Sequence, residues 1–251
     1  ADETVAQDVL NNVLTHCPYH QTTLIQQALA PDKMKVAFFI GAGCPTAIRI
    51  PDGDGTRPLI PDIVGLTARI RQVIEASDVH KDNFAKLVAR MAKAGTKNPN
   101  VEEMLSYIRS LGEVVSGGAI DGLKHDDLIK LDNEICKVTT DVVEVSLPVD
   151  DSHYHQLAAW IRGIPRSKAA EVFTSNYDLL MEQAFEDRKV PYFDGFVGSR
   201  HAFFDLAAIE HDKLPSRWAR FWKVHGSINW WRSESGNVER RPTSEVGDRQ
   251  M

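Results

Sequence analysis

Three short stretches of this chain combine residue types that could do chemistry on a nucleotide. Residues 41–44 (GAGC) follow the apolar run 38–40 (FFI), and glycines at a strand end let backbone N–H groups approach a pyrophosphate. Residues 174–178 (TSNYD) supply an amide and a carboxylate, and residues 223–227 (KVHGS) supply an imidazole. Together these stretches predict a dinucleotide held beside an acid/base pair.

The glycine turn also has an ordinary interpretation. The usual dinucleotide fingerprint has a third glycine where this chain has Thr46, and no acidic residue clearly ends a second strand about 20 residues later. Gly41 and Gly43 could therefore form a plain tight turn after a buried strand.

Asn176, Asp178 and His225 each follow an apolar run, so we expect them at the same carboxyl edge of a sheet as Gly41. Either Asn176 or Asp178 could instead cap the following helix, a common use of both residue types. Histidine titrates near neutrality and suits proton transfer, although a lone histidine is more often structural. Three polar strand ends at one edge favour a site.

Composition limits the classes of protein that fit. The chain has 251 residues, of which 43% are hydrophobic, enough for a sizeable buried core. Its formal net charge of −6 argues against a surface devoted to nucleic acid. No run approaches the roughly 20 apolar residues of a membrane span, and the N-terminus is acidic and mixed. We expect a soluble, cytoplasmic protein that binds neither membranes nor nucleic acid directly.

The cysteines and paired histidines do not indicate a metal site. Cys17, Cys44 and Cys136 are far apart and form no CxxC pair, which supports neither a zinc ribbon nor a disulfide framework. His153 and His155 are two residues apart, so on a helix they point in different directions. We assign no metal.

The apolar runs 35–40, 170–174 and 221–224 read as strands buried on both faces, which is typical of a parallel sheet. Between the first two lies about a hundred residues of helical pattern, too long for one crossover helix. We predict an α/β fold, a Rossmann-like parallel sheet flanked by helices, as a single domain over residues 1–251. A helical insertion at about 62–168 would lie over the ligand-binding edge.

Smaller features accompany this core. Leading helices are expected within residues 1–30, a Gly/Asp/Pro-rich loop at 51–61, and a short hairpin-like tail after Trp230 and Trp231. Asn100 with Glu103 forms a capping-box pattern, and we expect Glu102 and Glu103 to serve the N-terminus of that helix.

With FFIGAG, TSNYD and KVHGSINW in this order, the chain resembles the sirtuin superfamily, and in particular the bacterial sirtuin-like NAD-degrading domains of antiphage defence systems. The stretch 193–198 (FDGFVG) looks like the same branch. The resemblance spans about residues 35–231. It implies a Rossmann-like fold that binds NAD as its substrate.

The resemblance also implies roles for individual residues. Gly41, Ala42, Gly43 and Cys44 would lie at the pyrophosphate, with Thr174, Ser175 and Gly226 completing the nucleotide site. Asn176 and Asp178 would lie near the nicotinamide and its ribose, and His225 on the ribose hydroxyls or an attacking water. The three catalytic candidates are thus Asn176, His225 and Asp178.

The chain departs from the wider family in three ways. Deacylating sirtuins carry four zinc-binding cysteines, which this chain cannot supply, so water becomes the expected acceptor. Cys44 stands where the family often has serine, and a thiol is a poorer hydrogen-bond donor. Nothing after Trp231 matches the family's adenosine-binding turn, so we expect a fragment of a longer chain.

The leading hypothesis is an NAD glycohydrolase that yields nicotinamide and ADP-ribose and acts as the toxic effector of a bacterial antiviral system. By family analogy we expect control by homo-oligomerisation or by a regulatory partner, such as a nucleic-acid-sensing ATPase/helicase or an Argonaute-like protein. The alternatives are an NAD-dependent protein deacylase and a non-catalytic sensor that binds NAD or an ADP-ribose derivative and drives assembly.

Overall fold

The computed structural model describes residues 17–28, 35–115, 117–149, 151–163, 168–210, 214–215 and 217–244. Of the predicted leading helices, the structure contains α2 (Pro18–Ala28), and residues 1–16 lie outside the described part. None of the described helices combines the length and apolar character needed to cross a bilayer.

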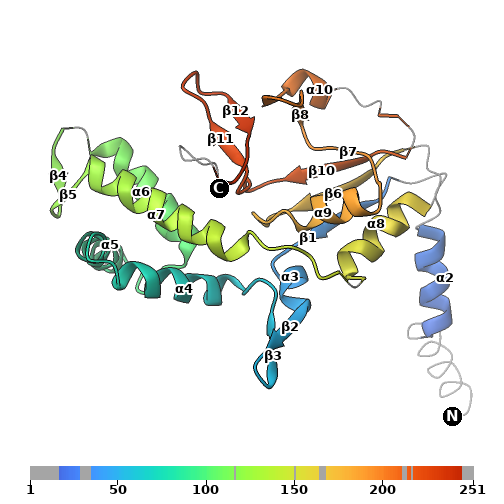
Figure 1. The fold of residues 1–251 in the computed structure, drawn as a ribbon, viewed down its shortest axis with the longest axis horizontal. Coiled ribbons are helices and arrows are strands. Elements are labelled where there is room, and N and C mark those ends of the chain that lie inside the picture. Colours follow the sequence, from blue (N-terminus) through green and yellow to red (C-terminus); the bar gives the residue numbers. More distant parts are fainter. Residues whose placement is uncertain are drawn as a thin grey trace, which may run out of the picture.

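A four-stranded parallel sheet forms the base of the fold (Figure 1). Its strands, in spatial order, are β1 (Ala37–Ile40), β6 (Ala170–Thr174), β10 (Ala219–Lys223) and β7 (Tyr192–Phe193). All three pairs are parallel. The predicted α/β, Rossmann-like fold with helices flanking a parallel sheet is therefore confirmed, with the third predicted strand beginning two residues earlier, at Ala219.

Two helices cover the same face of this sheet. Phe38 and Phe221 both lie opposite Val172 in the register, so all three side chains share a face. The ring of Phe38 contacts Trp160 of α8 (His153–Gly163) at 5.4 Å, and that of Phe221 contacts Phe185 of α9 (Leu180–Asp187) at 5.9 Å. These edge-on aromatic contacts fix both helices against the strands.

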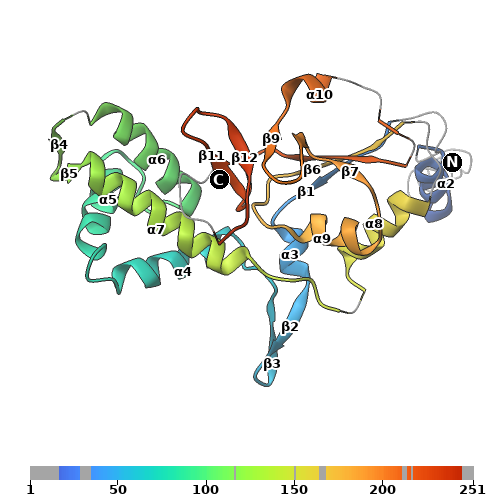
Figure 2. The ribbon, with the colours of Figure 1, turned by 45° about the horizontal axis from the view of Figure 1, so that its top comes forward.

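Four further helices form a separate group, which we call the helical lobe. They are α4 (Ile63–Glu75), α5 (Lys81–Lys93), α6 (Val101–Val114) and α7 (His125–Val143). Each turns an apolar stripe inward, and Ile70, Leu87, Met104 and Leu131 are at most 2% exposed. Figures 1 and 2 show the lobe to one side of the parallel sheet. It falls within the predicted insertion, whereas α8 packs with the sheet; the domain limits themselves stay a prediction.

A second, antiparallel sheet has its tail-hairpin edge between the lobe and the parallel sheet in both views (Figure 2). It contains the predicted tail hairpin, β11 (Trp230–Arg232) with β12 (Val238–Arg240), joined to β9 (Ala202–Phe204) and β8 (Phe196–Val197). A short helix, α10 (Leu206–Glu210), follows β9. Strands of two or three residues are too short to carry a periodicity, so β8 and β9 were not expected.

The structure corrects one loop prediction. Residues 49–58 form a hairpin of β2 (Arg49–Asp52) and β3 (Gly55–Pro58), where we expected an irregular loop from residue 51. Its turn uses Gly53 at φ +56°, a conformation that glycine adopts without steric cost. The turn residues were present in the sequence, but their flanking segments lack the β-branched alternation that signals strands.

The remaining short elements are α3 (Gly43–Ala47), β4 (Ala119–Ile120) and β5 (Leu123–Lys124).

Candidate functional site

The register of the parallel sheet brings the three chemistry-bearing stretches to one edge. Ile40, Thr174 and Lys223 lie opposite one another at the carboxyl ends of β1, β6 and β10. Asn176 comes two residues after Thr174, and His225 two residues after Lys223. Both therefore leave their strands at the same level, directly beyond the paired residues. The predicted convergence of these strand ends is confirmed.

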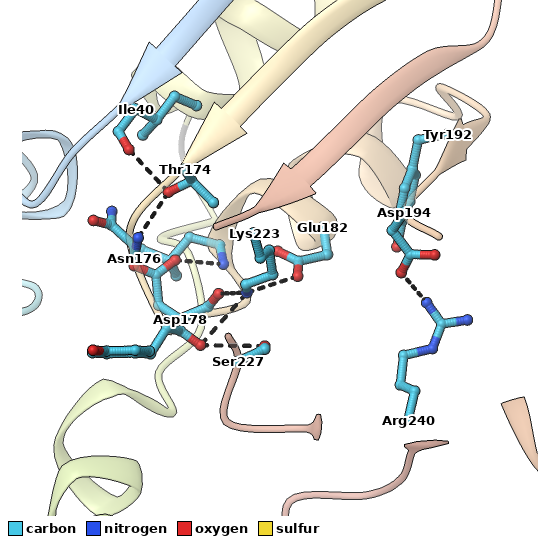
Figure 3. A network of polar contacts seen from close by, with 12 residues as sticks. Ile40, Thr174, Asn176, Asp178, Glu182, Tyr192, Asp194, Lys223, Ser227 and Arg240 are labelled. Carbon is cyan, nitrogen blue, oxygen red and sulfur yellow. Dashed lines mark hydrogen bonds and ion pairs between the residues drawn. The ribbon is translucent and has the colours of Figure 1, made fainter. Parts of the chain in front are cut away.

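Thr174 joins the first two stretches through its buried hydroxyl (Figure 3). The hydroxyl donates to the Ile40 carbonyl at 2.9 Å and accepts from the Asn176 backbone N–H at 3.0 Å. The Asn176 side-chain amide in turn donates to the Gly41 carbonyl at 3.2 Å. The glycine turn and the amide thus form one hydrogen-bonded unit.

Asp178 is buried, and its carboxylate serves the start of α9. Its Oδ1 accepts from the backbone N–H of Leu180, the first residue of α9, at 3.0 Å, although the N-cap position itself is Leu179. Burial raises the pKa of the Asp178 carboxyl, and the positive charge of Lys223 and several hydrogen bonds oppose that rise only in part. Asp178 therefore lies at the site but with much of its hydrogen-bonding capacity already used.

A buried ion pair lies beside the 174–178 segment (Figure 3). The ammonium of Lys223 donates to Glu182 Oε1 at 2.9 Å and also to the carbonyl of Asp178. The Lys223 side chain is 2% exposed and that of Glu182 14%. Burial raises the pKa of Glu182, and Lys223 lowers it by a smaller amount. Sequence reasoning missed this pair, although a lysine ending an apolar strand was the available signal.

A cavity of about 220 Å³ opens at this edge, between the sheet and the helical lobe. On the sheet side its wall includes Ala42, Ser175, Asn176, Tyr177 and Asp178. The lobe side includes Ile63, Leu66, Asn100, Glu102 and Val143. Larger cavities of about 630 and 730 Å³ lie against the lobe elsewhere, but none of the predicted site residues lines them. The lobe therefore forms the far wall of the candidate site.

The other predicted residues do not line this cavity. Gly43 begins α3, and the Cys44 N–H donates to the Gly41 carbonyl at 3.0 Å, closing the turn. Partial burial is the main reason that the pKa of the Cys44 thiol is raised, so the thiol stays neutral. His225 is exposed in the turn after β10, and Gly226 follows it at φ +94°.

Glu102 and Tyr177 line the cavity, although the sequence did not predict them as site residues. Glu103 forms the predicted capping box, because Asn100 N–H donates to Glu103 Oε2 at 2.8 Å and Glu103 N–H to Asn100 Oδ1 at 3.0 Å. Glu102 instead lines the cavity and accepts from the Tyr177 hydroxyl at 3.4 Å. Burial and the nearby Glu102 charge raise the pKa of Tyr177, so its hydroxyl remains a donor.

Tyr154 of α8 is a further residue that sequence reasoning missed. Its hydroxyl is buried and, within the part of the chain that the structure describes, has no hydrogen-bond partner. Burial is the main cause that raises its pKa, the charge of Asp178 raises it further, and the nearby Asn176 side chain lowers it by a smaller amount. An aromatic residue at helical spacing gave no sign of a polar role.

Neither histidine of the 153–155 pair lies in a metal cluster. His155 Nδ1 lies 2.9 Å from the Ser152 hydroxyl, and its Nε2 lies 3.0 Å from Asp187 Oδ2. Among the described residues no three histidine, cysteine, aspartate or glutamate side chains gather as metal ligands would. That the protein uses no metal stays a prediction.

Replacing Thr174 with valine should lower the free energy of unfolding by about 1–3 kcal/mol, because the partly buried Asn176 N–H loses its acceptor. Thr174→Ser keeps the hydroxyl and loses only a methyl group, at about 0.8 kcal/mol. Urea denaturation of both variants measures the difference. A valine variant more stable than the serine variant would contradict the bridging role.

Asp178→Asn should become progressively more stabilising, relative to the natural residue, as pH rises. An aspartate has a pKa of about 3.9 in the unfolded chain, and burial raises it in the folded protein. The folded state therefore loses stability as pH rises from the unfolded pKa through the folded one, whereas asparagine does not titrate. Urea denaturation in a pH series that starts near the unfolded pKa, at about pH 4, and rises from there tests this. A difference that falls with pH would refute it.

One comparison with known proteins bears on this edge of the sheet. The family model of the SIR2-like domain matches residues 170–241, which contain β6, Asn176, Asp178, β10, His225 and the tail hairpin. No curated protein matches the chain. The match lies outside the glycine turn and the helical lobe. Residues 170–241 are thus SIR2-like, and the predicted resemblance to the sirtuin superfamily is confirmed over this part of the chain.

Proposed function

We propose that this protein is an NAD glycohydrolase that cleaves NAD to nicotinamide and ADP-ribose. The observation that carries the proposal is the position of Asn176. It lies within the SIR2-like region, lines the cavity at the strand ends, and is hydrogen-bonded to the glycine turn. An NAD-related function follows from the SIR2-like region, and the glycohydrolase activity is the finer statement that we propose.

The proposed reaction breaks the bond between C1′ of the ribose and the nicotinamide nitrogen. The bonding electrons pass to the ring nitrogen, and positive charge develops on the ribose as in other glycosidic cleavages. A water oxygen then bonds to C1′. In this proposal Asn176 orients that water and His225 takes its proton. General base catalysis of this kind typically contributes about 10²- to 10⁴-fold in rate.

The nucleotide would extend from this cavity along the glycine turn. Ala42 lines the cavity, and its neighbours Gly41 and Gly43 have no side chains. The space beside both glycines is open, because a Cβ at either position would meet no atom within 4 Å. This open backbone supports a pyrophosphate beside residues 41–44. Ser175 in the cavity wall, Thr174 beneath it and Gly226 after β10 complete the proposed contacts.

Water is the acceptor that we favour over an acylated lysine. The three cysteines are dispersed, and Cys136 is buried in the lobe, so they do not supply the zinc-bound module of a deacylase. A protein deacylase is therefore the second candidate. A sensor that binds NAD without turning it over is the third, and the assay below separates it from the first.

The proposed biological role is that of a toxic effector in bacterial antiviral defence, and it rests on the family resemblance. An enzyme that empties the cell of NAD has to be restrained until it is needed. We propose restraint by self-association or by a regulatory protein partner, with the helical lobe as its contact surface.

The direct test is release of nicotinamide from NAD by the full-length protein, together with its partner and trigger where these are known. Asn176→Ala and His225→Ala should both abolish turnover. His153→Ala is the matched control, because His153 is also exposed but lies at the start of α8. It should leave turnover unchanged.

Turnover that survives both substitutions would overturn the site assignment. Tight binding of NAD with no turnover under any triggering condition would favour the sensor. Nicotinamide release that requires an acylated peptide would favour the deacylase.

A further inference from the structure

We propose that Glu102 is a catalytic carboxylate of this site, supplied by the helical lobe, which stabilises the positive charge on the ribose as nicotinamide leaves. The inference rests on the proposed function and deepens it. It gives the lobe a chemical task in addition to forming a wall.

The position of Glu102 is the first argument. It lies in the first turn of α6, is half-buried, and lines the same cavity as Asn176 and Tyr177. The Tyr177 hydroxyl donates to Glu102 Oε1 over a long 3.4 Å contact. Because Tyr177 directly precedes Asp178 and follows Asn176, this contact ties the lobe carboxylate to the catalytic segment of the sheet.

The second argument is that no cationic side chain forms an ion pair with the carboxylate of Glu102 in the described part of the chain. The carboxylate accepts a hydrogen bond from the neutral Tyr177 hydroxyl. A carboxylate in the wall of a cavity attracts a cationic ligand that enters the cavity, because opposite charges at short range stabilise each other more strongly where protein partly replaces water. The nicotinamide ring of NAD carries a positive charge, and so does the ribose in the transition state.

The other carboxylate in the cavity is less able to do this work. Asp178 is buried, accepts a hydrogen bond from the Leu180 N–H, and interacts with the positive charge of Lys223. In many glycosidic cleavages a carboxylate that faces the sugar stabilises the transition state. Glu102 is the cavity residue that can take this role.

Helix capping does not account for Glu102. The neighbouring Glu103 completes the capping box with Asn100, so the helix start is already satisfied. The two adjacent glutamates thus have different roles. Glu103 stabilises α6, and Glu102 faces the cavity.

The chemistry balances without a further reactant. The C1′–N bond breaks and its electron pair neutralises the nicotinamide ring, while the Glu102 carboxylate lowers the energy of the ribosyl cation. Water bonds to C1′ and its proton passes to His225, so the step needs no proton from Glu102. Preorganised charges of this kind are typically worth about 10²- to 10³-fold in rate.

The test compares Glu102→Gln with Glu103→Gln in the full-length protein, under conditions where the natural protein releases nicotinamide. Glu102→Gln should lower kcat for release about 10²-fold and leave the melting temperature nearly unchanged. Glu103→Gln should keep kcat within about twofold and lower the melting temperature, because it weakens the capping box. Tyr177→Phe, which removes only the hydroxyl, should lower kcat by up to about tenfold.

The outcomes separate this inference from the proposed function. Equal kcat for Glu102→Gln and Glu103→Gln, with the natural protein active, would overturn the role of Glu102 and leave the glycohydrolase standing. Loss of activity in Glu102→Gln that is matched by a lower melting temperature would also overturn it. A natural protein that never releases nicotinamide would overturn both. Partial recovery of kcat in Glu102→Asp, which keeps the charge, would support the electrostatic role.

Discussion

The buried ammonium of Lys223 is the constraint on which the candidate site depends. A charge that is 2% exposed must be compensated, and Lys223 finds its partners in Glu182 and in the backbone carbonyls of the 177–178 segment. The lysine ends β10, so it ties the loop after β6 to the neighbouring strand. That loop then holds Asn176 against the Gly41 carbonyl. Removing either partner of a buried pair typically costs about 3–5 kcal/mol, which here would also displace the site.

The parallel sheet and the helical lobe each form one wall of the cavity. The register places the polar ends of β1, β6 and β10 at one level. The sheet edge alone is an open surface, and the lobe closes it with Leu66, Val143 and the start of α6. An apolar wall facing a few polar groups is the usual form of a small-molecule site. The same division makes the lobe a natural point of control over a site that it completes.

Much of the sheet and its edge could be predicted from the sequence, whereas the tertiary contacts of single charged residues could not. The apolar runs that precede Gly41, Asn176 and His225 are local signals of buried strands. That the three residues share one edge of the sheet follows from parallel topology. The Asn100–Glu103 capping box was equally local. Lys223, by contrast, pairs with Glu182 only because α9 folds back over the sheet, and the orientation of Glu102 depends on how the lobe meets Tyr177. Such contacts join segments that are distant in the sequence, so the spacing of residues along the chain does not predict them.

The central claim is that water entering at this strand edge cleaves NAD at C1′. Reaction of the full-length protein with NAD in ¹⁸O-enriched water, followed by mass spectrometry of the product, tests it most directly. Our account predicts ADP-ribose with one ¹⁸O atom at C1′ and nicotinamide in equal amount, with no acylated peptide present. Intact NAD under all triggering conditions, or an ADP-ribosyl product without the label, would contradict it.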